Sequence, residues 1–513
     1  MADPVAESQE EKQSDWKFTQ WFRKMDNPDE GDSDFLSAVE FDDTGKFLAT
    51  GDRSGHIVIL ENDTSGGPTT PEGKPVNVHY KFYAEFTSHS PEFDYVRSLA
   101  VEEKINKIKW LPRTNESLYM LTTNDRQIKL WKIHEKERKN LTSFNLDVQP
   151  ARYSIRSGIS MSSASPLDLQ RTNPIVKTLK IPKVVKGEKV KFPFLKKKYA
   201  KDVHQFNIGS LDVSTDGETF LSGDNLRINL WNLSVSDSSY NIVDMKPADM
   251  QNLSEIITSL DYHPSYSNIF LYSSSLGNIR YCDLRMRALV DQEAKLFSIR
   301  RDNTGDGEDN KGFFDEMTQN VTDAKFSKGG RFIISRDYMS VKIWDVNMER
   351  RPVQVIHVHE YLREKMWDLY ENDLFWDNFG LGISSKGDVV TGSYSNYFHL
   401  YNLAEAQDTF VQASQPPLSV TSTSKSSQPR PSTYSQDDIA MFKDGKKKKT
   451  GMGLGNLFKR GKKSKKKNYG DGYPFNIDFE SLEFDKKILE CAWHPQDDAV
   501  AIAGQNNLYI YAK

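Results

Sequence analysis

Short apolar segments alternate with polar turns along most of the chain, and they recur in groups of three. The last segment of each group alternates between two kinds of side chain, as in Ile128-Lys-Leu-Trp-Lys-Ile133 and Val341-Lys-Ile-Trp-Asp-Val346. Alternation with a period of two predicts β-strands, and Gly, Asn and Asp in the gaps predict tight reversals. Seven such groups occur, and their last strands begin at Ile57, Ile128, Ile228, Ile279, Val341, Phe398 and Leu508.

All seven groups share one internal order. A middle strand precedes each last strand, as LATGDRSG does before Ile57, and an opening strand precedes both. The opening strands begin at Val39, Ile108, Leu211, Leu260, Ala324, Gly382 and Cys491. Repeated β-meanders that end near Trp-Asp, about every 40–45 residues, are typical of WD40-type propellers. The sequence therefore predicts an all-β protein, a seven-bladed WD40-type β-propeller.

One further strand is predicted near the N-terminus, at Trp16-Lys-Phe-Thr-Gln-Trp-Phe22. The seventh group provides only three strands, so we expect this segment to supply its fourth and to remove the open sheet edge. Residues 1–15 are polar and acidic, and we expect them to be disordered. The predicted propeller thus spans 16–513.

Two insertions are too long for ordinary blade connections. The first covers 134–203, and its part from Lys177 to Phe194 alternates Lys with Leu, Ile, Val and Phe around Gly187-Glu188. This pattern predicts a protruding β-hairpin arm that turns at Gly187-Glu188 and has one apolar and one basic face. A disordered loop is the alternative. An exposed apolar face on a hairpin would require a partner.

The second insertion covers 404–480 and begins with a tract rich in Ser, Thr, Pro and Gln, followed by a Lys-rich run. Such a composition cannot bury enough apolar surface to fold alone, so we expect a disordered, low-complexity basic loop. A solvated loop, a nuclear localisation signal, and a contact with an anionic membrane or nucleic acid are three interpretations. Few aromatic residues accompany the lysines, which disfavours stacking on single strands.

Charge is distributed unevenly. The net charge is −4, yet 443–467 holds twelve Lys/Arg against one acid, and 171–201 holds eleven against one. The remaining residues of the chain therefore carry a net charge of about −25. Acidic blades should attract basic partners and repel nucleic acid.

Two other features bear on location. No run of 18 apolar residues occurs, so no membrane-spanning helix is expected. Cys282 and Cys491 lie within predicted strands, which favours buried thiols in a reducing compartment. We therefore expect a cytoplasmic protein, which would also be nuclear if the basic run is a localisation signal.

No catalytic motif is present. The chain has no phosphate-binding Gly-rich loop after a strand and no G-x-S-x-G, H-E-x-x-H or C-x-x-C motif. His263 and His494 precede Pro in equivalent turns, so we interpret them as repeat features, and His357 with His359 is a weak metal pair. We expect no catalytic residue, no cofactor, no metal, and no inward-pointing acids in the central channel. An interaction protein is favoured over an enzyme.

Several segments between the blade strands carry a more specific resemblance. The stretch EFDYVRSLAVEEKINKIKWLP, from Glu92 to Pro112, resembles the signature of the WD40-type B regulatory subunits of protein phosphatase 2A. Further similar stretches begin at Asn225, Asn241, Arg336, His359, Tyr370, Lys486 and Asn506. The resemblance covers nearly every blade in order and leaves out the two insertions and the extreme N-terminus.

The resemblance implies a non-catalytic subunit of a heterotrimer. Members of this family dock on a helical-repeat scaffold subunit, next to the catalytic subunit, and they select phosphoprotein substrates. An arm from the second blade grips the scaffold, and here the 134–203 insertion occupies that place. An acidic groove on the top face recruits phospho-Ser/Thr sites with basic flanks. A WD40 interaction scaffold of another protein assembly is the alternative function.

Matching the family motifs to this chain implies a set of groove positions. They are Asp32, Arg53, Asp224, Asn225, Leu253, Glu371 and Asp373. The family usually has two acids where this chain has Asp224 and Asn225, a tyrosine at Phe206 and a lysine at Asn378. These departures make substrate preference a separate question from family membership.

Overall fold

The computed structural model describes twelve stretches of the chain. They are 16–23, 35–63, 78–95, 98–113, 117–142, 181–199, 203–290, 294–299, 313–372, 377–403, 407–413 and 482–513. The chain divides into two compact units, one formed by 1–132 with 195–513 and the other by 133–194. The segment 1–15, predicted to be disordered, lies outside the described stretches, as does most of the predicted basic loop.

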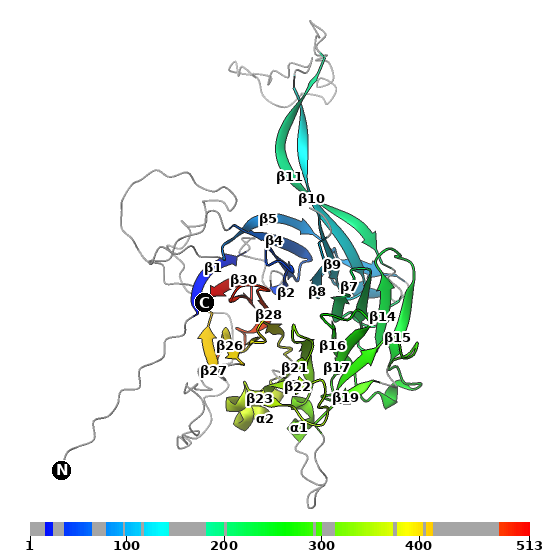
Figure 1. Cartoon of the computed structure of the whole chain (residues 1–513), viewed down its shortest axis with the longest axis vertical. Helices are drawn as coiled ribbons and strands as arrows, with labels where there is room; N and C mark the ends of the chain where they lie inside the picture. The colour runs from blue at the N-terminus through cyan, green and yellow to red at the C-terminus, as the bar shows by residue number, and fades with distance from the viewer. Residues whose placement is uncertain are drawn as a thin grey trace, which may run out of the picture. The chain divides into compact units, whose positions relative to one another are not determined.

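Seven four-stranded sheets form a ring of blades within the described part of the chain (Figure 1). The first three blades, from inner to outer strand, are β2 (Leu36–Phe41), β3 (Phe47–Asp52), β4 (His56–Asn62) and β5 (Tyr80–Thr87); β8 (Lys107–Trp110), β9 (Leu118–Thr123), β10 (Ile128–Thr142) and β11 (Lys183–Lys198); and β12 (Ser210–Val213), β13 (Thr219–Gly223), β14 (Arg227–Asn232) and β15 (Ser239–Asp244). The predicted opening strands of these blades are confirmed.

The remaining blades repeat this order. They are β16 (Ile257–Tyr262), β17 (Ile269–Ser274), β18 (Ile279–Asp283) and β19 (Lys295–Phe297); β20 (Val321–Phe326), β21 (Phe332–Asp337), β22 (Ser340–Asp345) and β23 (Gln354–His357); β24 (Leu381–Ile383), β25 (Val389–Gly392), β26 (Tyr397–Asn402) and β27 (Gln407–Gln412); and β28 (Ile488–Trp493), β29 (Ala499–Gly504), β30 (Asn507–Ala512) and β1 (Lys17–Arg23). β27 lies inside the predicted loop 404–480, so that boundary was wrong: alternating QDTFVQ completes the sixth blade.

The N-terminal strand closes the ring as predicted. β1 pairs antiparallel with β30, from Lys17 opposite Ala512 to Arg23 opposite Asn507. The ring of Phe18 packs edge-on against Tyr511, with 5.7 Å between centroids. The seventh blade is therefore built from strands near both ends of the described residues, and the edge of β30 is paired.

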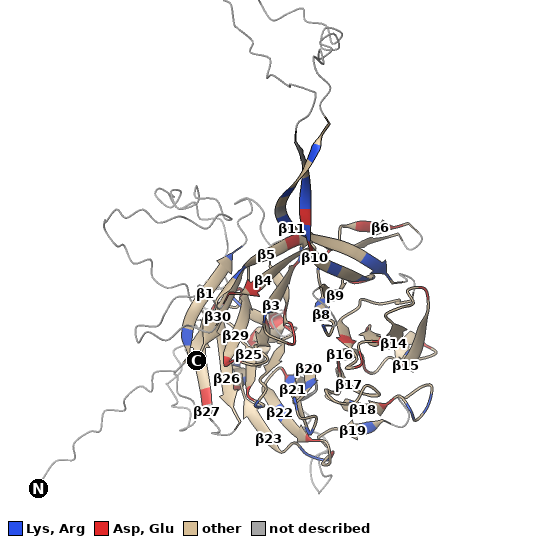
Figure 2. Ribbon diagram, turned by 45° about the horizontal axis from the view of Figure 1, so that its top comes forward, with Lys and Arg blue, Asp and Glu red and all other residues tan. Residues whose placement is uncertain are grey.

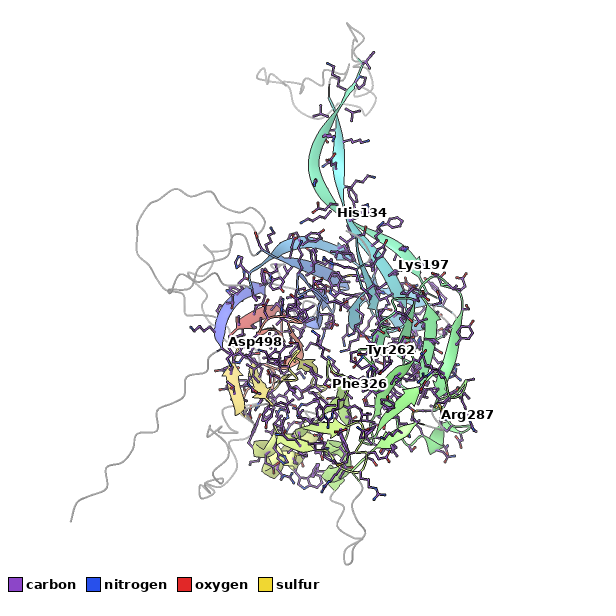
Figure 3. The ribbon with its side chains drawn as sticks, viewed as in Figure 1. His134, Lys197, Tyr262, Arg287, Phe326 and Asp498 are labelled. Carbon is purple, nitrogen blue, oxygen red and sulfur yellow. The ribbon has the colours of Figure 1, made fainter. Side chains whose placement is uncertain are left out.

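Carboxylates on the inner strands join consecutive blades. Asp212 accepts a hydrogen bond from the backbone N–H of Tyr262 at 2.6 Å, and Asp261 accepts one from Phe326 at 2.8 Å. Asp323 accepts one from Leu381 at 3.1 Å. Figure 3 labels Tyr262 and Phe326 on these inner strands. The third, fourth, fifth and sixth blades are thus linked through side chains as well as through apolar packing.

The two turn histidines also link blades. The Nε2 atom of His494 lies 3.1 Å from the carbonyl oxygen of Gly45, and His263 lies against Gly330 in the equivalent place. Both glycines have positive φ, 71° and 69°. The interpretation of these histidines as repeat features is confirmed, and Cys282 and Cys491 are buried thiols that form no disulfide, as predicted.

The smaller unit is a hairpin arm made from the ends of two long strands, β10 and β11 (Figure 2). Lys186 pairs with Glu137 at 3.6 Å and Lys189 with Glu135 at 3.9 Å. The predicted turn at Gly187-Glu188 was wrong, because Gly187 lies within β11 opposite Arg138. Acids on 134–142 give the basic strand a complementary neighbour, which a turn inside 177–194 would not provide.

Shorter elements occupy the connections between blades. They are the two-stranded β6 (Glu92–Asp94) and β7 (Leu99–Val101), the 3-10 helices η3 (Met250–Asn252) and η5 (Glu360–Lys365), and the helices α1 (Phe313–Thr318) and α2 (Met366–Glu371). Neither described α-helix is long and apolar enough to cross a membrane.

The turn glycines allow a matched stability test. A Cβ atom on Gly330 would lie 2.2 Å from His263 Nε2 at a left-handed φ, whereas a Cβ on neighbouring Gly329 meets nothing within 4 Å. We expect Gly330→Ala to lower the free energy of unfolding by about 2–4 kcal/mol, because strain and overpacking add. Gly329→Ala should change it by less than about 0.5 kcal/mol. Urea unfolding of both variants checks this, and equal losses would contradict it.

Candidate functional site

The predicted groove residues that the structure describes lie at one end of the blades. In a four-stranded antiparallel meander, the turn between the second and third strands and the connection to the next blade fall at the same end. Arg53 and Asn225 occupy second-to-third turns, whereas Leu253 and Glu371 occupy connections to the next blade. We call this end the upper face. Asp32 and Asp373 lie outside the described residues.

Asp224 differs from the expectation because its side chain is buried. Its carboxylate lies 3.0 Å from His204 Nδ1 and accepts hydrogen bonds from the backbone N–H groups of Leu226 and Arg227. Burial raises the pKa of Asp224, but these hydrogen bonds outweigh burial and the net shift is downward. A surface role in a groove does not fit this position. The residue instead fixes the β13–β14 turn.

The same histidine, His204, also contacts residues in the core of the blade. His204 Nε2 lies 2.6 Å from Ser222 Oγ, which also accepts a hydrogen bond from Trp231 Nε1 at 2.8 Å. In the fifth blade, Trp344 donates to Ser335 in the same way at 3.0 Å. The Trp and Asp positions of the repeat therefore belong to internal networks. A turn acid beside a Leu-Arg-Ile-Asn-Leu-Trp strand could have been assigned to such a network from the repeat pattern.

Arg53 and Asn225 lie around the central channel. Both line a cavity of about 420 Å³ whose wall comes from the inner strands, and Asn378 lines the same cavity. Arg53 is exposed and stacks over the Phe35 ring at 5.2 Å. The structure therefore brings together three of the positions that the motif comparison selected, two of them as groove residues and one as a departure from the family.

The channel carries acids, contrary to the expectation from the sequence. Lys107 pairs with Glu490 at 2.8 Å, and Lys109 pairs with Glu40 at 2.9 Å. Lys109 also lies 3.5 Å from Asp212. Despite burial, the neighbouring acids Glu40 and Asp212 hold the pKa of Lys109 well above its usual value. Opposite charges from different blades thus neutralise one another inside the ring.

Asp261 is the acid of this channel that lacks a close lysine. Burial and the neighbouring Asp212 hold the pKa of the Asp261 carboxyl well above its ordinary value. Its partner is the backbone N–H of Phe326. In the described part of the chain, no three His, Cys, Asp or Glu side chains converge as a metal site. His357 and His359 also diverge: the side chain of the first is about half exposed and the second is buried against Tyr338 and Ser393.

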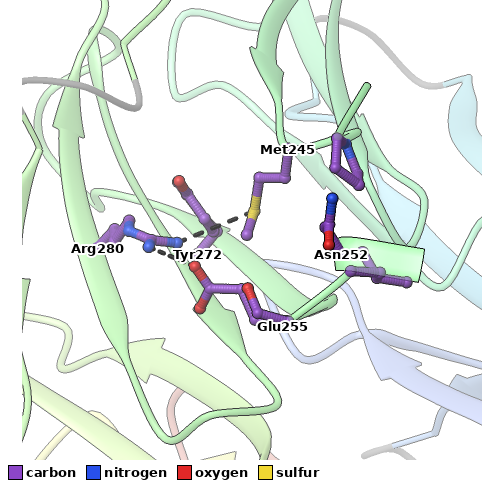
Figure 4. Close-up of a pocket in the computed structure, with 8 residues that line it drawn as sticks. Met245, Asn252, Glu255, Tyr272 and Arg280 are labelled. Atoms are coloured by element: carbon purple, nitrogen blue, oxygen red, sulfur yellow. Dashed lines mark hydrogen bonds and ion pairs between the residues drawn. The ribbon is translucent and has the colours of Figure 1, made fainter. Parts of the chain in front are cut away.

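Leu253 lines a separate open pocket of about 240 Å³ on the upper face (Figure 4). Asp249 caps η3 by accepting a hydrogen bond from Gln251 N–H, and the helix ends at Leu253, which is 37% exposed. The other lining residues are Met245, Pro247, Asn252, Ser254, Glu255, Tyr272 and Arg280. The pocket combines an apolar wall with polar groups at one side.

An ion pair forms the polar side of this Leu253 pocket. Arg280 pairs with Glu255 at 2.5 Å and lies over the Tyr272 ring at 5.6 Å. Burial raises the pKa of Glu255, but the Arg280 hydrogen bond and charge lower it overall. Sequence reasoning missed Glu255, Tyr272 and Arg280, because nothing in the motifs indicates that β17 and β18 face the loop that carries Leu253.

Glu371 is the exposed last residue of α2, in the connection between β23 and β24. Met366 and Leu369 hold the helix by packing into a core cluster with Tyr338, Phe379 and Tyr394. Trp367 is 61% exposed and packs edge-on against Phe314, with 5.0 Å between centroids. The connection thus presents a carboxylate and an aromatic side chain to solvent from a firmly packed base.

The repeat order, the internal Trp-Ser networks and the ring closure define a seven-bladed WD40-type propeller with an arm in its second blade. Serine/threonine-protein phosphatase 2A regulatory subunit phr2AB of Dictyostelium discoideum is 37% identical over 97% of this chain and 98% of its own length. The protein phosphatase PP2A regulatory B subunit of Schizosaccharomyces pombe is 41% identical over the same shares. The chain therefore belongs to the family of regulatory B subunits of protein phosphatase 2A.

Other comparisons add little to this assignment. No protein-family model matches the chain. Among solved structures, Raptor of Chaetomium thermophilum superposes with a TM-score of 0.49 at 10% identity, covering 97% of this chain and 29% of that one. The family assignment rests on the two curated relatives, and it places the chain among regulatory rather than catalytic subunits.

The buried Asp224 network yields a pH-dependent prediction. The folded-state pKa of Asp224 is lowered, so its contribution to stability is present above the unfolded pKa and is lost as pH falls through the folded pKa. We expect Asp224→Asn to lower the free energy of unfolding at pH 7, and the difference from wild type to shrink toward pH 3. Asp216→Asn, at an exposed acid that accepts a hydrogen bond from the backbone N–H of Glu218 in the same blade, is the control. Chemical denaturation at pH 7, 5 and 3 checks this, and a pH-independent difference would contradict it.

Proposed function

We propose that this protein is a non-catalytic subunit that docks on the phosphatase scaffold and brings phospho-Ser/Thr substrates with basic flanks to the catalytic subunit. The proposed recruitment surface, called the upper-face groove here, includes Arg53, Asn225, Leu253 and Glu371. The observation that carries the proposal is the Leu253 pocket. It offers a cavity with an apolar wall and a polar side on the same face as Glu371, so that one peptide can use both an apolar contact and a charge.

Electrostatics supports a basic substrate. About −25 of charge lies outside the two basic segments, whereas the whole chain carries −4. Acidic surfaces raise the association rate of basic partners and lower that of acidic ones, and salt screens both effects. The acidic surface would therefore attract the lysines and arginines that flank a phosphorylated residue, and it would not bind the phosphate group itself.

The arm supports a docking role. Five apolar side chains of 181–194 are 47–83% exposed, namely Ile181, Val184, Val185, Phe192 and Phe194. Exposed apolar side chains in this density mark interaction surfaces. Phe192 and Phe194 are two residues apart in β11, so both point to one face of the strand. We assign this face to contact with the scaffold subunit.

The groove proposal is tested by charge reversal. We expect Glu371→Lys to weaken binding of a basic-flanked phosphopeptide, and we expect the loss to be larger at low salt than at high salt, because a surface charge acts over a Debye length. Glu349→Lys, an equally exposed change in the β22–β23 turn at the opposite end of the blades, is the control. Fluorescence anisotropy at two salt concentrations measures this. Equal affinities for both variants at low salt would reject Glu371 as a groove residue.

The anchor is tested separately. We expect Leu253→Ala to weaken binding of the same peptide by about 1–2 kcal/mol, roughly five- to thirtyfold, with little salt dependence, because the side chain supplies part of the apolar wall of the pocket. Leu276→Ala is matched in chemistry and exposure, since Leu276 is 48% exposed in the β17–β18 turn of the same face. A similar loss in both variants would show that general surface apolarity, not the pocket, is responsible.

The arm is tested with the double variant Phe192→Ser/Phe194→Ser. We expect weaker binding to the scaffold subunit with an unchanged melting temperature, because both rings are about half exposed and belong to a unit outside the propeller. Surface-immobilised scaffold measures the affinity, and Val235→Ser, exposed on the propeller, is the control. If the double variant binds the scaffold subunit with wild-type affinity, another surface of the protein must make the scaffold contact.

A further inference from the structure

A buried arginine occupies a position that other blades fill with small residues. Arg336 is the last but one residue of β21, next to the turn between the second and third strands of the fifth blade, and its side chain has no exposed surface. It lies opposite Val341 on the third strand, and the residues at the equivalent position of the other blades are Gly51, Thr123, Gly223, Ser273, Gly392 and Ala503. At Gly392, for example, a Cβ would lie 2.0 Å from a backbone oxygen of the next blade. The fifth blade holds a long side chain at this position instead.

Among the described residues, no carboxylate forms an ion pair with the guanidinium of Arg336. Its Nε and Nη1 atoms are buried without a hydrogen-bond partner. The adjacent Asp337 is committed to Ser340, to the backbone N–H of Met339 and to Lys342. Burial lowers the pKa of Arg336 to about 10, which leaves the group charged at neutral pH. Burying an unpaired cation is costly, and a neutral side chain of similar volume would avoid that cost.

Arg336 contacts both ends of the connection between β23 and β24. Its Nη2 lies 3.4 Å from His359 Nδ1, and its guanidinium carbon lies 5.6 Å over the Phe379 ring. His359 begins the connection between β23 and β24, and Phe379 is near its end. Glu371 and the exposed Trp367 lie between them. One side chain therefore touches the segment both before and after the part that faces solvent.

Each of these ends is also attached to the propeller. His359 Nδ1 lies 2.7 Å from the carbonyl oxygen of Tyr338, and its Nε2 lies 2.9 Å from Ser393 Oγ in the next blade. Thr322 donates to the carbonyl oxygen of Phe379 at 2.9 Å. A planar cation can stack on one ring while its edge faces another, which a lysine or an apolar chain does less well.

We propose that Arg336 is a positioning residue for substrate recruitment, holding both ends of the β23–β24 connection so that Glu371 is presented in a fixed place. This inference rests on the proposed function of Glu371. A fixed carboxylate binds more tightly than a mobile one because less conformational freedom is lost on binding. Arg336 itself is buried and does not touch substrate.

The experiment uses the full chain and a fluorescent peptide with one phosphothreonine-proline site flanked by lysines and arginines. Arg336→Met removes the charge at similar volume, and Phe379→Leu removes the ring but leaves the guanidinium. We expect each to weaken peptide binding about three- to tenfold at high salt, where changes in long-range potential are screened. Arg336→Lys should fall between Arg336→Met and wild type, since it keeps a cation over the ring but lacks the planar edge that reaches His359.

Two further readouts separate positioning from a general structural role. Hydrogen exchange should become faster across 359–372 in Arg336→Met and Phe379→Leu, while the melting temperature of Arg336→Met should not fall. Wild-type affinity at high salt with unchanged exchange in both variants would overturn the inference. Glu371→Lys is run in parallel: if it weakens binding while the other two variants do not, the inference fails alone, and if it has no effect at low salt, the proposed groove fails.

Discussion

The fold depends on contacts that close a ring rather than on any single blade. Five successive inner strands carry Glu40, Lys109, Asp212, Asp261 and Lys325 at equivalent places, and these charges meet partners in neighbouring blades. Enclosed in the ring without partners from the neighbouring blades, these groups would be costly to bury in a low-dielectric interior. Each blade is therefore stabilised by being one of seven, and the upper face derives its fixed geometry from this mutual dependence.

The strands could be predicted from the sequence because both alternation and turn residues are local signals. Alternation in segments such as Val341-Lys-Ile-Trp-Asp-Val346 marks strands, and Gly or Asp marks reversals, so the blades and the closing N-terminal strand followed from the sequence. The Gly187-Glu188 turn failed for a non-local reason. The partner of β11 is the end of β10 that carries Glu135 and Glu137, more than forty residues upstream, and no local feature of 177–194 reveals it.

The site was harder to predict from the sequence. Alternation with a period of two shows which residues of a strand share a face, but it does not show what covers that face. In a propeller each face of a blade packs against a neighbouring blade. Acids such as Asp212, which the alternation assigns to a polar face, are therefore enclosed within the ring. Family motifs located Leu253 and Glu371, yet they also selected buried Asp224. Arg280 and Arg336 needed the tertiary structure, because their significance lies in which distant residues they contact.

Pairing β1 with β30 has a consequence for synthesis of the chain. These strands are nearly five hundred residues apart in sequence, so the last blade cannot form until both have been synthesised. Contacts of such high sequence separation slow folding, and a nascent propeller has an open edge that invites mispairing. During that interval the chain would depend on whatever shields unpaired strands in the cell. Its folding yield is then governed by how readily β1 pairs with β30.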